Sequence, residues 1–205
     1  MRMQVGTTRM QLMKLRRRLG VARRGHKLLK DKQEELMRRI LGLIDEIRDH
    51  RVRVEKETGR VLGRLAVARN AFDPRLFDEA VLVPTRKVAV RVETKNILNV
   101  KVPVFKKEIS GKTRCYGFAR TSGELDFALV ALEELLDSLL VLAEKEKTLE
   151  LLADEMEKTR RRVNALEFVL IPDIEETVAF IALKLSENER GDLTRLMRVK
   201  EIIRK

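Results

Sequence analysis

The most chemically distinctive stretch of the sequence runs from Lys14 to Lys32 and reads KLRRRLGVARRGHKLLKDK. Nine of its nineteen residues are lysine or arginine, and one, Asp31, is acidic. A run this basic could neutralise the phosphates of a nucleic acid, or bind an acidic surface of a protein or a membrane. The whole chain of 205 residues carries a formal net charge of +12, which indicates the same classes of partner.

Residue types that catalyse reactions or bind metals are few and far apart. The two histidines, His26 and His50, are separated by 24 positions, and Cys115 is the single cysteine. These spacings do not match a metal site, and no GxxxxGK[ST] or GxGxxG phosphate-binding loop occurs. Acidic pairs such as Glu133 and Glu134 are expected to lie on solvated helix faces. We therefore expect no catalytic residue, no metal ligand and no cofactor.

An apolar repeat in the first third of the chain predicts a long helix. Its steps of three and four residues give a mean period near 3.5, which is typical of a left-handed coiled coil. Thr7 or Thr8 is expected to cap the start of the helix, and Pro74 follows the end of the pattern. The residues expected to face a partner helix, here called the seam, are Leu12, Leu15, Leu19, Ala22, His26, Leu29, Gln33, Leu36, Ile40, Leu43, Ile47, His50, Val54, Glu57, Val61, Leu65 and Ala68.

Five glycines fall inside this predicted helix, at positions 20, 25, 42, 59 and 63. Each costs about 1 kcal/mol of helix stability relative to alanine. Close approach of another backbone, or a helix that is required to twist, would explain them.

A second long helix is expected after residues 121–124, whose sequence TSGE matches a capping box. Pro172 interrupts its apolar stripe, and a proline inside a helix removes a hydrogen bond and usually kinks the helix. Packing must hold the helix together at that point. The stripe comprises Leu125, Ala128, Leu132, Leu135, Leu139, Leu142, Leu149, Leu152, Met156, Thr159, Val163, Leu166, Leu170, Ile174, Thr177, Ile181 and Leu185, with a continuation through Leu196 and Val199.

Between the two helices, the apolar period falls to two residues, which is typical of β-strands. Residues 88–92 and 100–104 alternate in this way around the polar stretch TKNIL, so they predict a β-hairpin with a polar turn. Pro103 requires an edge or irregular position. A short helix is expected at 75–83 before the hairpin, and the stretch EISGKTRCYGFAR after it is expected to be a loop.

These elements predict a mainly α fold, a long antiparallel two-helix left-handed coiled coil with a short helix and β-hairpin insert at one end. We expect three segments, namely an N-terminal coiled-coil helix (1–72), an insert with short helix, hairpin and loop (73–121), and a C-terminal coiled-coil helix (122–205). The net charge is +12 over residues 1–70 and −6 over residues 122–205, so the helices are electrostatically complementary.

Antiparallel order is also expected to bring the basic residues 9–32 beside the basic residues 190–205, at one positive tip. Because the seam positions of this segment face the partner, the basic side chains are spread around the remaining surface. Charge on all sides suits insertion into a surrounding collar better than contact along a duplex. A basic coiled coil that binds nucleic acid or acts as a scaffold is the alternative.

Three blocks of sequence carry a resemblance to a known family. They are TRMQLMKLRRRL followed by RRGHKLLKDKQEEL, then KNILNVKVPVF in the hairpin region, then MEKTRRRVNALEFVLIPDIEETVAFIALKLSENER followed by TRLMRVK. These blocks, in this order, resemble the D subunit of the V-type and archaeal-type (A-type) rotary ATPases and ATP synthases. The resemblance covers essentially the whole chain.

The resemblance implies a non-catalytic central rotor shaft, which transmits torque between a catalytic A/B hexamer and the ion-translocating ring in the membrane. The implied partners are the A and B subunits, the F subunit, and the socket subunit (C/d type) above the proteolipid ring, with no nucleic acid and no direct membrane insertion. The implied location is peripheral, on the cytoplasmic side of the cell membrane. The residues expected to contact the hexamer are Arg16, Arg17, Arg18, Arg23, Arg24, Lys27, Arg195 and Arg198, and those expected at a shaft contact or bend are Arg161, Arg162, Glu167 and Pro172.

Overall fold

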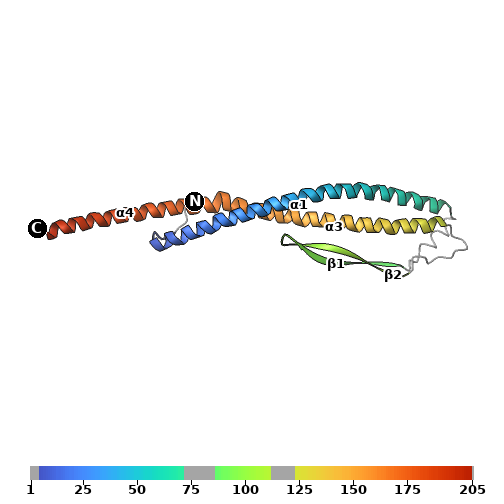
Figure 1. Ribbon diagram of the computed structural model, residues 1–205, viewed down its shortest axis with the longest axis horizontal. Coiled ribbons are helices and arrows are strands. Elements are labelled where there is room, and N and C mark those ends of the chain that lie inside the picture. Colours follow the sequence, from blue (N-terminus) through green and yellow to red (C-terminus); the bar gives the residue numbers. More distant parts are fainter. Residues whose placement is uncertain (1–4, 72–85, 112–122, 205) are drawn as a thin grey trace. The chain divides into compact units, whose positions relative to one another are not determined.

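A computed structural model describes residues 5–71, 86–111 and 123–204 of the chain. The expected mainly helical fold is confirmed, with two long helices packed together and a small antiparallel hairpin (Figure 1). None of the described helices contains a stretch long and apolar enough to cross a membrane. The elements are helix α1 (Arg9–Asn70), strands β1 (Lys87–Ile97) and β2 (Val100–Ser110), helix α3 (Gly123–Ala165), the π-helical turn η1 (Leu166–Leu170) and helix α4 (Ile171–Ile203).

The chain divides into two compact units. The first unit comprises residues 1–35 and 156–205, and the second comprises residues 36–155. The short helix expected at 75–83, the first residues of the expected capping box, Cys115 and most of the expected loop around it lie outside the described residues.

Helix α1 begins as its sequence predicts. The Thr8 hydroxyl oxygen accepts a hydrogen bond from the Gln11 backbone N–H at 3.2 Å, and the Thr8 carbonyl accepts one from the Leu12 N–H at 3.0 Å. Thr8 therefore satisfies donors of the first turn that would otherwise lack a partner, as an N-cap residue does. The helix ends at Asn70, just before Pro74.

The seam predicted for α1 is confirmed along the whole helix. All seventeen positions are buried or half-buried, whereas most residues between them are exposed. The 3.5-residue repeat therefore identified the buried face of α1 correctly. The buried members, as opposed to the half-buried ones, are Leu15, Ala22, Leu36, Ile40, Ile47, Val54, Val61 and Ala68.

The five glycines of α1 do not mark a close approach within the described chain. A Cβ atom added at any of them would have no heavy atom within 4 Å, apart from the local helix backbone. We therefore expect Gly42→Ala to raise the free energy of unfolding by about 1 kcal/mol, because alanine loses less backbone entropy in a helix. Urea denaturation of the purified chain measures this change. A lower stability would show that position 42 needs the freedom of glycine.

The core of the second unit lies between α1 and α3. Ile47, Val54 and Val61 of α1 pack against Ala131, Leu135 and Leu142 of α3. Two ion pairs flank this core, joining Arg51 to Glu146 at 2.6 Å and Lys145 to Glu46 at 2.8 Å. The two helices thus pair through an apolar seam bordered by opposite charges, as expected for an antiparallel coiled coil.

The apolar stripe predicted for α3 is wrong at two positions. Leu132 and Leu139 are 43% and 41% exposed, while Ala131 and Leu135 are buried. Apolar residues occupy adjacent positions throughout this part of the helix, so two stripes fit the sequence. The structure selects the stripe that places the small Ala131 side chain against α1.

The hairpin is longer and its turn tighter than predicted. Its strands pair one to one from Lys87 opposite Ser110 to Ile97 opposite Val100. Most of the stretch TKNIL thus belongs to β1, and Glu108, Ile109 and Ser110 belong to β2 instead of a loop. Leu98 and Asn99 form a two-residue turn with φ values of 51° and 69°, which matches a type I′ turn.

One edge of the hairpin lies against α3. Arg86, just before β1, donates hydrogen bonds of 2.7 and 2.6 Å to the two carboxylate oxygens of Glu133. This bidentate bond lowers the pKa of Glu133 and raises that of Arg86. Lys107 of β2 forms an ion pair with Asp137 of α3. The hairpin is therefore anchored to α3 by Arg86 just before β1 and by Lys107 of β2.

Pro172 is the second residue after the π-helical turn η1. The Ile171 N–H donates to the carbonyl of Leu166, five residues earlier, and α4 continues with Pro172 in its first turn. In an uninterrupted α-helix the proline ring would clash with the carbonyl of Phe168. The backbone forms the wider π turn here instead of a regular α-helical turn, and the chain remains helical beyond Pro172.

Candidate interaction site

The basic stretch from Lys14 to Lys32, here called the basic segment, belongs to α1, and most of its charged side chains lie on the outside of the coiled coil in the first unit. Leu15 packs against Ile174 and Ile181 of α4, and these three side chains are at most 6% exposed. This apolar seam fixes which face of α1 is buried. Consequently all six predicted contact residues of α1 are exposed, namely Arg16, Arg17, Arg18, Arg23, Arg24 and Lys27.

Most of these cations have no acidic partner among the described residues. Arg23 forms an ion pair with Glu175 of α4 at 2.7 Å, and Arg24 Nε donates to the Gly20 carbonyl at 3.3 Å. Exposed pairs of this kind contribute at most about 1 kcal/mol each. Arg16, Arg17 and Arg18 have no carboxylate contact within the described chain, so their charges are available to an external acidic surface.

The expected meeting of the two basic ends is wrong. Arg9 contacts Glu189 and Arg23 contacts Glu175, so the stretch of α4 beside the basic segment supplies carboxylates. Residues beyond Glu189 extend past the start of α1. Arg195 and Arg198 are exposed there, with Arg195 Nη1 3.6 Å from Asp192, and they do not lie beside Arg16 or Lys27.

The C-terminal part of α4 has no cover within the described chain. Every described residue from Ser186 onwards is exposed. An apolar group on so bare a helix is typical of a surface that a partner covers. Its members, with exposed fractions of 50 to 78%, are Leu193, Leu196, Met197, Val199, Ile202 and Ile203.

The segment around the π-helical turn combines charge with exposed apolar surface. Arg161 and Arg162 are exposed, with Arg161 paired to Glu157 one turn away, and Pro172 is also exposed. Glu167 lies within η1, and its Oε2 atom is 3.3 Å from His26 Nε2 of α1. This contact links the π turn to the basic segment across the coiled coil.

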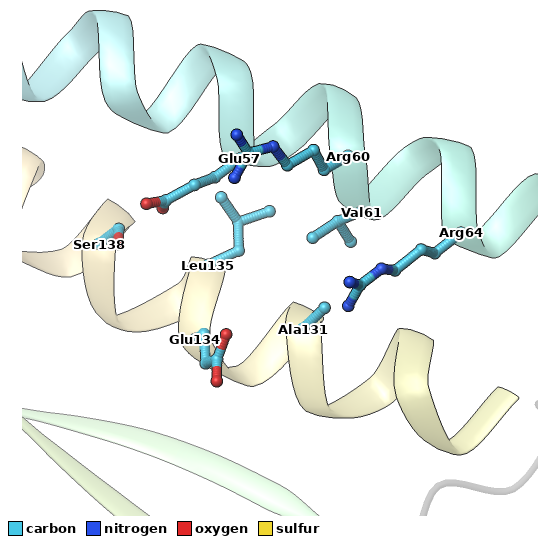
Figure 2. Close-up of a pocket in the computed structure, with 8 residues that line it drawn as sticks. All are labelled: Glu57, Arg60, Val61, Arg64, Ala131, Glu134, Leu135 and Ser138. Carbon is cyan, nitrogen blue, oxygen red and sulfur yellow. The ribbon is translucent and has the colours of Figure 1, made fainter. Parts of the chain in front are cut away.

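A hollow of about 190 Å³ lies between α1 and α3 in the second unit (Figure 2). This volume is smaller than that of typical small-molecule pockets, which hold about 300 to 1,000 Å³. One carboxylate oxygen of Glu57 is buried here without a hydrogen-bond partner among the described residues, a setting that an ordered water suits. The lining residues are Glu57, Arg60, Val61, Arg64, Ala131, Glu134, Leu135 and Ser138.

Comparison with known proteins identifies the family. The family model described as the D subunit of ATP synthase matches residues 11–201 of the chain. This chain belongs to the family of ATP synthase D subunits. The resemblance inferred from its sequence blocks is thereby confirmed.

Relatives in this family match over their full length. The V-type ATP synthase D subunit of Fusobacterium nucleatum is 49% identical over 207 residues, with 100% of this chain and 98% of that protein covered. The D subunit of Clostridium botulinum (strain ATCC 19397) is 49% identical over 208 residues, with coverage of 99% and 96%. The D subunit of Acetivibrio thermocellus is 46% identical over 205 residues, with coverage of 98% and 92%.

Sequence reasoning missed two exposed apolar residues of this family member. Phe168 and Val169 in η1 are 71% and 58% exposed. The seam pattern assigned Leu166 and Leu170 to the buried face, which already left Phe168 and Val169 off that face. An aromatic residue outside the seam, four residues before Pro172, was the available signal.

The chemistry of His50 predicts a pH dependence of stability for this family member. Burial lowers the pKa of His50 below its usual 6.5, with smaller lowering effects from Lys145 and Arg53 and opposing effects from Glu46 and Asp49. Below a pH of about 6.5 the unfolded chain therefore binds the proton more readily than the folded chain, and stability falls as the pH falls.

In His50→Gln we expect the free energy of unfolding to fall less steeply as the pH is lowered from about 7.5 to about 5. Carboxylates contribute less to the pH dependence of stability in this range, because most of them titrate at lower pH. Urea denaturation at a series of pH values measures this slope. An unchanged slope in the variant would contradict the assignment to His50.

Proposed function

We propose that the chain is the central rotor shaft of a V/A-type ATPase or ATP synthase and is not itself catalytic. It transmits torque between the catalytic A/B hexamer and the ion-translocating ring in the membrane. The observation that carries this proposal is the likeness over the full chain to V-type ATP synthase D subunits. The other partners are the F subunit and the socket subunit (C/d type) above the ring, and the chain lies at the cytoplasmic side of the cell membrane.

The charges of the first unit support contact with a surrounding collar. Its apolar seam is buried between α1 and α4, while Arg16, Arg17 and Arg18 are exposed without acidic partners in the described chain. Acidic groups lining a hexamer would attract such side chains, and the attraction would weaken as salt is added. The exposed end of α4, with Arg195 and Arg198, supplies further charged and apolar contacts.

The π-helical segment supports a second contact in the same role. Arg161, Arg162 and Pro172 are exposed, and Glu167 is held near His26. A shaft with different side chains on its different sides contacts identical neighbouring subunits unequally, so their nucleotide sites differ in affinity. Coupling of this kind is reciprocal, because a site that prefers one shaft angle also biases that angle.

The proposal predicts a fixed place in the assembly. Affinity purification through a tag on this chain, followed by native mass spectrometry, is expected to give one copy for each A/B hexamer, together with the F subunit. Several copies in each complex, or purification without any ATPase component, would contradict the rotor role.

A further inference from the structure

The two outer edges of the β-hairpin differ in what covers them. In a hairpin with a two-residue turn, the pair that flanks the turn is hydrogen-bonded, and bonded pairs then alternate with non-bonded pairs along the strands. Ile97 and Val100 flank the turn, so alternate residues from that pair outwards bond across the hairpin. The N–H and C=O groups of the intervening residues point away from the partner strand.

The outer edge of β2 is closed. The outward N–H of Phe105 donates to the carboxylate of Glu144 in α3 at 3.1 Å. Pro103, opposite Thr94, occupies another outward position and has no N–H to satisfy. Val102 is only 2% exposed. Together these features leave little of the β2 edge available to another strand.

The outer edge of β1 is open. All residues from Lys87 to Asn96 are exposed. The strand contains no proline, and its one-to-one register excludes a bulge, so it lacks two common protections against strand addition. The outward backbone groups, which have no hydrogen-bond partner among the described residues, belong to Val88, Val90, Val92, Thr94 and Asn96.

The side chains of β1 indicate which chemistry would fit this edge. Val88, Val90 and Val92 share one face and are 44%, 42% and 57% exposed. Lys87 and Lys95, near the two ends of the strand, have no carboxylate partner within the described chain. By contrast, the other charged residues of the strand already pair with β2, as Arg91 with Glu108 and Glu93 with Lys106.

We propose that the outer edge of β1 accepts an extended segment of another protein as a third strand. Main-chain hydrogen bonds to the open edge would bind the segment, and alternating side chains would select it. The segment carries apolar residues opposite the valines and carboxylates near Lys87 and Lys95. A second copy of β1 fits less well, because each copy carries more basic than acidic side chains.

This surface goes beyond the rotor role, although the proposed assembly is where its partner would be found. Hydrogen exchange of residues 87–97 is measured in the isolated chain and in the complex purified through this chain. We expect the five outward amides of β1 to exchange quickly in the isolated chain and slowly in the complex. Equal exchange in both would overturn the proposal while leaving the rotor role intact.

A synthetic peptide tests the same edge without the complex. The probe has the length of β1, with valine at alternate central positions and glutamate near each end, and it is titrated against the full chain. We expect it to protect the outward amides of β1. If no ATPase component co-purifies with the chain, the proposed rotor role is wrong. The peptide experiment then tests the proposal for the β1 edge by itself. Absence of protection by the peptide would then overturn the edge proposal.

A proline variant isolates the contribution of the backbone edge. The N–H of Val90 points outward, so Val90→Pro removes a docking donor without removing a hairpin bond, as Pro103 already does on β2. We expect it to weaken peptide binding about tenfold or more, since a buried acceptor of the peptide loses its donor. Val90→Thr keeps the N–H and the branched side chain and is the matched control.

Protection of the inward amides of β1 reports whether the hairpin of the proline variant remains folded. Binding by a folded Val90→Pro chain as tight as that of the unaltered chain would overturn the proposal. Protection of the outward amides in the isolated chain, together with a dimeric mass in solution, would also overturn it, because the occupant would then be a second copy.

Discussion

Deletion of residues 190–205 is expected to reduce ATP-driven ion pumping by about tenfold or more, and to reduce ATP turnover by less. These residues follow the Arg9–Glu189 contact, and those described are exposed, so their removal leaves the seam of Leu15, Ile174 and Ile181 intact. What is lost is the exposed surface that we propose contacts the hexamer. Pumping into membrane vesicles and phosphate release by the same preparation measure the two quantities.

A full-length variant separates the contribution of the charged side chains of this segment from that of its apolar side chains. Arg195→Gln combined with Arg198→Gln keeps the apolar side chains of the same segment and removes two exposed charges. We expect a smaller loss of pumping than after deletion, and a weaker dependence on salt than in the unaltered protein. Undiminished pumping by the deletion variant would contradict the role assigned to this segment.

Ile174→Ala is expected to lower the free energy of unfolding by about 2 to 5 kcal/mol, as large-to-small substitutions in cores do. Ile174 is 0% exposed and packs with Leu15 and Ile181. It follows Pro172 closely, where the helix lacks a backbone hydrogen bond, so packing has a larger share in holding this turn. Denaturation of the purified chain in urea measures the change.

Leu183→Ala on the same helix is the matched control. Leu183 is 69% exposed, so its truncation is expected to change stability by no more than about 0.5 kcal/mol. A loss of similar size in both variants would mean that the buried seam does not dominate the stability of the first unit.

The buried face of α1 could be predicted because its seam residues recur every three or four positions along one helix. This spacing can be read from the sequence of that helix alone. The offset between two helices has no such signal, since sliding one helix by a heptad preserves its apolar pattern. The contact of Arg9 with Glu189, which separates the two basic ends, therefore required the structure.

For the candidate contact residues, exposure could also be predicted from the sequence, whereas their positions relative to one another could not. Exposure of Arg16 and Arg23 follows from the seam at Leu15 and Leu19, so it could be inferred from sequence. The position of Arg198 relative to them could not, because it depends on the offset. The hairpin turn at Leu98 and Asn99 was also missed, because it lacks the glycine that usually marks a type I′ turn.

The π-helical turn also constrains the length of the chain. A π turn is equivalent to one residue inserted into an α-helix, and each residue of an α-helix advances the chain by about 100°. If one residue of Leu166–Leu170 were deleted and the turn became α-helical, the later residues would keep their places, and Ile174 and Ile181 would stay buried. In that regular helix, however, the ring of Pro172 would clash with the carbonyl four residues earlier. Functional relatives with one residue fewer between Val163 and Ile174 should therefore lack a proline at the position of Pro172.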